Sequence, residues 1–158
     1  MFLLASFRDE KLHFRSNLQN SLYPATSIAH EFPVGKPERI LGKKLESLVL
    51  DNEKGFLYGN KRVMGMVQAT VLAPDSLFLP ILPVMSHEKL IFGLCKTCMD
   101  LKKVEVCTHS DAKRAITSVW TSAELEFACL ENGYRVLAIH EFFGYTESFP
   151  VFRRFYTK

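Results

Sequence analysis

Apolar and β-branched stretches alternate with polar, proline and glycine residues along the chain, a pattern that predicts several short strands. The clearest strand is Val63 to Leu72, which contains no charged residue and is expected at the centre of a sheet. Leu45 to Leu50 and Gly55 to Tyr58 flank the polar residues 51–54, and this arrangement predicts a β-hairpin. The remaining predicted strands are residues 11–16, Lys89 to Leu94, Ala115 to Trp120 and Tyr134 to Phe143.

One helix is predicted to begin after Thr121. The Thr121 hydroxyl can accept a hydrogen bond from the third helical N–H while Glu124 reaches back, which is the pattern of a capping box. Asn132-Gly133 supplies a left-handed end to the helix. The residues that would share its apolar face are Leu125, Ala128 and Cys129.

Prolines and glycines divide the rest of the chain. Residues 25–44 are interrupted by Pro33, Gly35 and Pro37 and are predicted to be mostly loop with one helical turn. Three prolines between residues 74 and 83 predict an extended connecting segment. Phe149 to Tyr156 is predicted to be an amphipathic or irregular tail. With 158 residues, the expectation is one α+β domain, residues 1–158, with a mainly antiparallel sheet and one clear helix.

Three cysteines and one histidine lie within fifteen residues, as a Cys-x2-Cys pair followed after eight residues by Cys-x-His. Thiolate and imidazole groups at this spacing can close a tetrahedral Zn²⁺ site. The ligands would be Cys95, Cys98, Cys107 and His109, while Cys129 stands apart. One alternative is a set of buried free thiols beside an unrelated histidine. A disulfide framework is disfavoured, because nothing in the sequence is typical of a secreted protein.

A site closed by four protein ligands leaves no position for water, so the pattern indicates a structural ion and not zinc chemistry. We therefore expect a small zinc knuckle at about residues 92–114, inserted at the end of a strand. The knuckle predicts how this segment folds and not what the protein does.

Charge and composition narrow the function classes only slightly. The net charge is +3 and the sequence pI is about 8.7, without the dense Lys/Arg runs of a nucleic-acid-binding arm. No signal-peptide pattern or membrane span is present, so we expect an intracellular protein of the nucleus or cytoplasm with no membrane partner. Thirteen phenylalanines predict either a dense core or an exposed apolar face that binds a partner.

Two stretches resemble a known family. Residues 19–24, Gln-Asn-Ser-Leu-Tyr-Pro, followed by Phe32-Pro33-Val34-Gly35-Lys36-Pro37, are similar to the first palm motif of protein-primed family B DNA polymerases, Asp-x-x-Ser-Leu-Tyr-Pro. The second stretch is similar to the palm segment of polymerases carried by Maverick/Polinton transposons and related viruses or plasmids. Its matching residues are Val71, Pro74, Leu82-Pro83, Phe92, Leu94-Cys95, Cys98, Cys107, His109-Ser110-Asp111, Arg114-Ala115, Trp120, Glu124-Leu125, Gly133-Tyr134 and Glu141.

This resemblance covers about residues 12–156 and implies a palm-like sheet. It also implies nucleotide-binding roles for three residues. Tyr23 would lie under the sugar of the incoming nucleotide, and Ser21 and Leu22 would place main-chain N–H groups near its triphosphate. The alternative is that Tyr23 packs in a core turn.

The same resemblance predicts that the chain alone does not polymerise DNA. Phosphoryl transfer of this kind needs two carboxylates holding two Mg²⁺ ions, and Leu18 stands where the first is required. We expect no productive Mg²⁺ binding and no catalytic residue, since the second carboxylate, the fingers and an exonuclease domain are also lacking. The leading hypothesis is a catalytically inactive palm fragment retained as a zinc-bearing module that binds protein or nucleic acid. The enzyme-class alternative is one piece of an active split or truncated polymerase.

A cluster of basic residues surrounds the cysteine pattern and could contact phosphates. Asp100, Glu105 and Asp111 dilute this cluster, so an ordinary solvated rim is the alternative. The candidate nucleic-acid contacts are Lys96, Lys102, Lys103, Lys113 and Arg114.

Aromatic residues crowd the last seventeen positions of the chain. In a complete polymerase such residues would pack against fingers and palm, so here they predict a protein partner or a larger assembly, as in an adaptor subunit. Strand phenylalanines are nevertheless more often core than interface. The residues are Phe142, Phe143, Tyr145, Phe149, Phe152, Phe155 and Tyr156.

The pair His140-Glu141 could suggest acid–base chemistry, but the sequence places no nucleophile beside it. A satisfied strand histidine is the favoured interpretation. No role is assigned to His13, His30 or His87.

Overall fold

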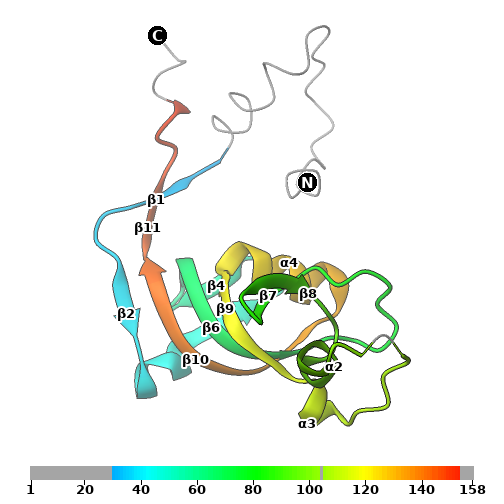
Figure 1. Cartoon of the computed structure of the whole chain (residues 1–158). Coiled ribbons are helices and arrows are strands. Elements are labelled where there is room, and N and C mark those ends of the chain that lie inside the picture. The colour runs from blue at the N-terminus through cyan, green and yellow to red at the C-terminus, as the bar shows by residue number, and fades with distance from the viewer. Residues whose placement is uncertain (1–29, 104, 154–158) are drawn as a thin grey trace, which may run out of the picture. The chain divides into compact units, whose positions relative to one another are not determined.

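A computed structural model describes residues 30–103 and 105–153 of the chain (Figure 1). The predicted strand at residues 11–16 and the motif residues Leu18, Ser21, Leu22 and Tyr23 lie outside the described residues. The chain separates into two compact units, residues 33–148 and residues 1–32 with 149–158. The prediction of a single domain over residues 1–158 stays a prediction.

The larger unit is built on a four-stranded antiparallel sheet. Its order is β2 (Glu38–Ile40), β10 (Arg135–Tyr145), β6 (Met64–Leu72) and β9 (Ile116–Thr121). The predicted uncharged strand is therefore confirmed as β6, and it is central because both of its edges are paired. The expected α+β class with mainly antiparallel sheets is confirmed; the palm-like character stays a prediction.

Alternation along the strands creates one apolar face. Val67, Ala69 and Val71 of β6 are fully buried, and so is Ile116 of β9. Two glycines allow β6 and β10 to approach closely, because Gly65 pairs with Gly144. A Cβ on Gly65 would lie 2.3 Å from the Phe143 carbonyl oxygen, so no side chain fits there.

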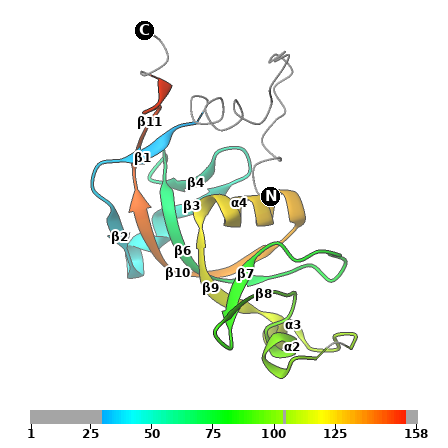
Figure 2. The same cartoon turned by 45° about the horizontal axis from the view of Figure 1, so that its top comes forward.

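The predicted helix is α4 (Ser122–Asn132), and Figures 1 and 2 show it packed on one side of this sheet. The capping box is confirmed: the Glu124 N–H donates to Thr121 Oγ1 at 3.2 Å, and the Thr121 N–H donates to Glu124 Oε2 at 2.9 Å. Gly133 ends the helix at φ +70°. Leu125 and Ala128 are fully buried, whereas Cys129 is half-buried.

Smaller sheets surround this core. The predicted hairpin is present as β3 (Leu48–Asp51) and β4 (Gly55–Tyr58), extended by β5 (Lys61–Arg62). Residues Gly42–Ser47 form the 3₁₀ helix η1, so β3 begins later than predicted. A second hairpin joins β7 (Pro83–Ser86) to β8 (Lys89–Phe92).

Short elements absent from our predictions complete the described chain. The helix α2 (Lys96–Leu101) lies within the cysteine pattern, and α3 (Asp111–Arg114) follows it. The strands β1 (Phe32–Val34) and β11 (Glu147–Phe149) pair with each other. In the smaller unit, the rings of Phe32 and Phe152 meet edge to face, with centroids 5.1 Å apart. None of the helices in residues 30–103 and 105–153 is long and apolar enough to cross a membrane.

Candidate metal centre

The four predicted ligands come together at the end of the β7–β8 hairpin. Cys95 follows β8 and is the N-cap of α2, and its Sγ accepts a hydrogen bond from the Cys98 N–H at 3.4 Å. This cap directs the Cys95 and Cys98 sulfurs to the same point. The helix ends at Lys102, which has a left-handed φ of +53°, and the chain then returns with Cys107 and His109.

The ligand atoms have the spacing of a metal site. All four lie within 4.8 Å of one another. The His109 Nδ1 atom is 3.5 Å from Cys95 Sγ, 3.3 Å from Cys98 Sγ and 3.5 Å from Cys107 Sγ. One ring nitrogen cannot share hydrogen bonds with three thiols at once, so this convergence is typical of ligands placed around one ion.

A tetrahedral ion fits these distances. With bonds of about 2.3 Å to sulfur and 2.1 Å to nitrogen, tetrahedral angles separate sulfur from nitrogen by about 3.6 Å. The observed sulfur–nitrogen distances of 3.3–3.5 Å are slightly shorter. A small outward movement of the ligands would bring them to the tetrahedral value. Cys95, Cys98, Cys107 and His109 are thus close together and could hold a metal ion, as predicted.

The thiols differ strongly in acidity when no cation is near. Burial, together with the neighbouring Cys95 and Cys107, raises the pKa of the Cys98 thiol to about 11. The pKa of the Cys107 thiol is lowered to about 7, mainly because the thiolate accepts a hydrogen bond from the His109 backbone N–H. Three thiolates in one site repel each other, so a bound divalent cation is what would keep them all ionised.

The disulfide alternative finds no support, because all four cysteines are free. Cys129 lies apart in α4, where burial raises the pKa of its thiol to about 11. A thiol of this kind is weakly nucleophilic at neutral pH and belongs to the packing of the helix.

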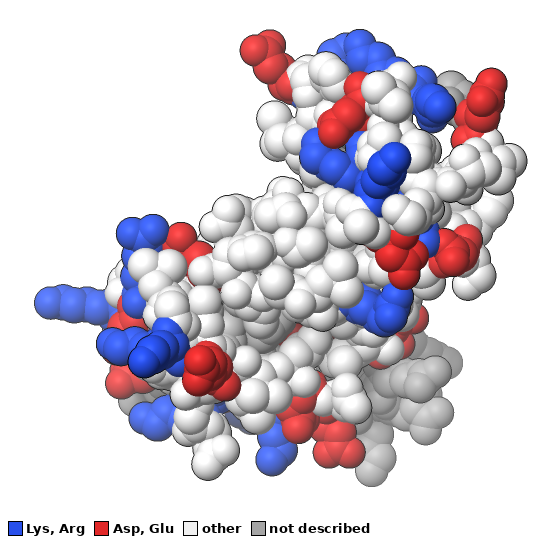
Figure 3. Space-filling model, turned by 90° about the horizontal axis from the view of Figure 1, so that it is seen from below, with Lys and Arg blue, Asp and Glu red and all other residues white. Residues whose placement is uncertain are grey.

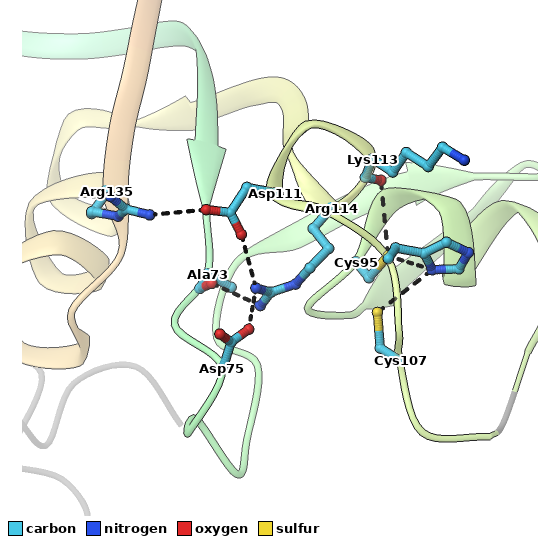
Figure 4. A network of polar contacts seen from close by, with 9 residues as sticks. Ala73, Asp75, Cys95, Cys107, Asp111, Lys113, Arg114 and Arg135 are labelled. Atoms are coloured by element: carbon cyan, nitrogen blue, oxygen red, sulfur yellow. Dashed lines mark hydrogen bonds and ion pairs between the residues drawn. The ribbon is translucent and has the colours of Figure 1, made fainter.

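Residues 95–114, which contain the four candidate ligands, are called the metal segment. A buried arginine attaches this segment to the main sheet (Figure 4). Arg114 is only 6% exposed; it donates to the Ala73 carbonyl at 2.9 Å and pairs with Asp75. Asp111 links the same network to β10 through Arg135, at 3.3 Å. The carbonyl of the neighbouring Lys113 accepts from Thr97 Oγ1 at 2.7 Å, which joins α3 to α2.

Comparisons with known proteins add nothing to this picture. No family model, curated protein or solved structure matches the chain.

Two of the five basic residues predicted to contact nucleic acid are held in ion pairs. Arg114 is buried in the network above, so it is withdrawn from the set of phosphate contacts. Lys96 pairs with Asp100 at 2.6 Å, which leaves Lys102, Lys103 and Lys113 exposed without an ion pair in the described part of the chain. On the face shown in Figure 3, basic and acidic side chains are interspersed around an uncharged central area.

The histidines have structural surroundings. His140 Nε2 lies 2.7 Å from Thr70 Oγ1, which also contacts Thr117 Oγ1 at 2.7 Å. Glu141 pairs with Arg39, whose hydrogen bond lowers the pKa of the Glu141 carboxyl. His140 thus contacts a hydroxyl that is itself paired with Thr117, and Glu141 contacts an arginine, in line with the interpretation as a satisfied strand histidine. His87 contacts Ser86 Oγ at 3.0 Å, and His30 is exposed.

The aromatic residues predicted to form a partner surface divide into two groups. Phe142 is 1% exposed and belongs to the core, so its assignment to that surface is wrong; its neighbour Phe143 is 46% exposed on the opposite face of β10. Phe149 and Phe152 are 38% and 40% exposed, and Tyr145 is half-buried. Phe155 and Tyr156 lie outside the described residues.

Proposed function

We propose that the bound ion is Zn²⁺ and that the chain is a zinc-stabilised, non-catalytic module that acts by binding a protein partner. The observation that carries the proposal is the Cys₃His cluster, whose ligand atoms lie within 4.8 Å of one another. Three sulfurs and one imidazole favour zinc over magnesium or calcium, which take oxygen ligands. Four protein ligands leave no site for a reacting water, so the ion stabilises the fold.

The ancestry that we propose is the palm of a protein-primed family B polymerase. It rests on the ordered motifs from residue 19 to residue 141. The proposed lack of polymerising activity rests on Leu18, which offers no ligand to Mg²⁺ at the position where the resembling motif has a carboxylate. Without this carboxylate a large electrostatic contribution to phosphoryl transfer is missing.

Protein is favoured over nucleic acid as the partner because the exposed face of the main sheet carries large apolar side chains beside its polar ones. Met66 and Val119 are 45% and 49% exposed, and Met66 pairs directly with Phe143. Of the predicted nucleic-acid contacts, Lys102, Lys103 and Lys113 have no ion pair within the described residues, and Glu105 follows closely in the sequence. An apolar surface with few positive charges is typical of a protein interface.

A primer–template assay read in two ways tests this function. We expect no nucleotide incorporation with Mg²⁺ or Mn²⁺, and no gain from Leu18→Asp, since one carboxylate cannot complete a two-metal site. We also expect the fluorescence anisotropy of labelled duplex to change only weakly and to lose that change by about 0.2 M salt, because so few lysines can displace counterions.

Two results would contradict the proposal. Template-directed extension that Tyr23→Ala abolishes would make the chain an active polymerase piece. Salt-resistant DNA binding that is lost when Lys102, Lys103 and Lys113 are changed to glutamine would make it a nucleic-acid-binding module.

A further inference from the structure

The β7–β8 hairpin has a tight turn that fixes its register. His87 and Glu88 have φ values of +51° and +60°, as a two-residue type I′ turn requires. Ser86 therefore pairs with Lys89, Met85 with Leu90, Val84 with Ile91 and Pro83 with Phe92. In such a hairpin the pair next to the turn is hydrogen-bonded, and the following pairs alternate.

This alternation determines where the main-chain groups of β8 point. The N–H and C=O groups of Lys89 and Ile91 point toward β7 and are hydrogen-bonded to it. Leu90 and Phe92 occupy the pairs without hydrogen bonds. Pro83 agrees with this assignment, because it stands opposite Phe92, where no N–H is needed from β7. The N–H and C=O groups of Leu90 and Phe92 therefore point outward, and no partner for them occurs within the described residues.

The β7 edge of the hairpin lies toward β9, where Trp120 Nε1 donates to the Pro83 carbonyl at 2.7 Å, whereas no such contact is made by the β8 edge within the described residues. One face of the hairpin is covered: Val84 and Ser86 are 2% and 7% exposed, and Ser86 Oγ donates to Asp100 of α2 at 3.3 Å.

The other face of the hairpin is apolar and exposed. Met85 is 63% exposed, Leu90 61% and Phe92 45%. An edge strand with free main-chain groups beside an apolar face is a template for another strand.

We propose that this edge pairs with the same edge of a second copy, forming a symmetric dimer through antiparallel β8 strands. A two-fold axis at Ile91 places Leu90 opposite Phe92 of the partner subunit, so outward-pointing groups meet and each such pair exchanges both of its hydrogen bonds. Lys89 then faces Gly93 and not a second lysine, so no like charges are opposed.

The strand is thus complementary to itself in hydrogen bonding, apolar contact and charge. These features favour a second copy over an unrelated chain as the occupant. The paired strands are short, so the dimer buries less area than the roughly 1,200–2,000 Å² that is buried in stable complexes. We therefore expect a reversible, concentration-dependent dimer.

Sedimentation velocity and amide hydrogen exchange on the full metal-loaded chain test this dimer together. We expect the sedimentation coefficient to rise from monomer to dimer with concentration. Over the same range, exchange of the Leu90 and Phe92 amides slows at least about tenfold, because they become hydrogen-bonded across the dimer. The Lys89 and Ile91 amides are bonded within the hairpin, so their protection stays constant and serves as an internal reference.

Two variants distinguish strand pairing from non-specific association through exposed apolar side chains. Leu90→Lys should raise the dissociation constant at least about tenfold, since it removes an apolar contact of the pair. Phe78→Lys is the matched control, because Phe78 is 91% exposed but lies outside the hairpin, and it should leave the dimer intact. Unchanged metal content shows that each variant is folded.

A chain that stays monomeric at every concentration would overturn the proposal. A dimer in which the Leu90 and Phe92 amides exchange equally fast at all concentrations, or one that Phe78→Lys disrupts and Leu90→Lys does not, would overturn it as well.

Discussion

Removing the metal should loosen the segment from Cys95 to Arg114 and leave the main sheet folded. The helices in this segment span six and four residues, far below the length at which a helix is stable alone. Met99 is the one α2 side chain that is buried in the core. A bound metal would therefore supply most of the cross-linking between residues 95 and 109.

Hydrogen exchange with and without EDTA measures this effect. Peptides covering Cys95 to Arg114 should exchange at least about tenfold faster after chelation, while peptides of β6 and β10 change little. Cys98→Ser should reproduce the chelated pattern without EDTA. Cys129→Ser is the matched control and should behave as the unaltered protein, because Cys129 lies outside the cluster. Unchanged exchange in the loop after full metal removal would show that the ion does not hold it.

Replacing Arg114 by methionine should lower the free energy of unfolding by about 2–3 kcal/mol. The largest part comes from the Ala73 carbonyl, since a buried acceptor that loses its donor costs about 1–3 kcal/mol. The ion pair contributes less, because Asp75 is 86% exposed and regains water when the arginine is gone. Methionine preserves most of the packing of the aliphatic stem.

Arg135→Met is the matched control for this substitution. Its ion pair with Asp111 joins side chains that are 68% and 63% exposed, and such a pair contributes about 0–1 kcal/mol. Urea unfolding of the metal-loaded variants should therefore show a much larger loss for Arg114 than for Arg135. Equal losses would mean that the Arg114 network does not anchor the metal segment to the sheet.

Features that depend on local chemistry could be predicted from the sequence. The capping box at Thr121 and the hairpin around residues 51–54 follow from a few adjacent residues, and both are present. The uncharged run of β6 indicated a strand at the sheet centre because charged side chains are rarely buried, and Val67, Ala69 and Val71 on its inner face are fully buried. The metal cluster was recognisable because short spacing alone brings its ligands together.

Features that depend on tertiary contacts could not be predicted. α2 and α3 are too short to show a helical period, and they exist where the cysteine turn and the Arg114 network hold them. The sequence presents Arg114 as one more surface charge, because its partner Ala73 lies 41 residues away. Phe142 and Phe143 are adjacent and identical in type, and only the register with β6 decides that Phe142 faces the core.

The enzyme-class alternative, one piece of a split polymerase, predicts a different partner from the one that we favour. It requires a second chain that supplies carboxylates and fingers to the region of Tyr23. A non-catalytic module requires only that its exposed apolar surface be covered. Leu18 favours the second alternative, because its side chain offers no oxygen ligand at the position where the resembling motif has a carboxylate.

X-ray absorption at the zinc edge, combined with elemental analysis of the purified chain, tests the central claim most directly. The account predicts one zinc per chain, with three sulfur neighbours at about 2.3 Å and one nitrogen at about 2.1 Å. It also predicts that Cys107→Ser loses one sulfur neighbour or the ion itself. A chain purified without zinc, or a Cys107→Ser variant with the same zinc content and the same three sulfur neighbours, would contradict the account.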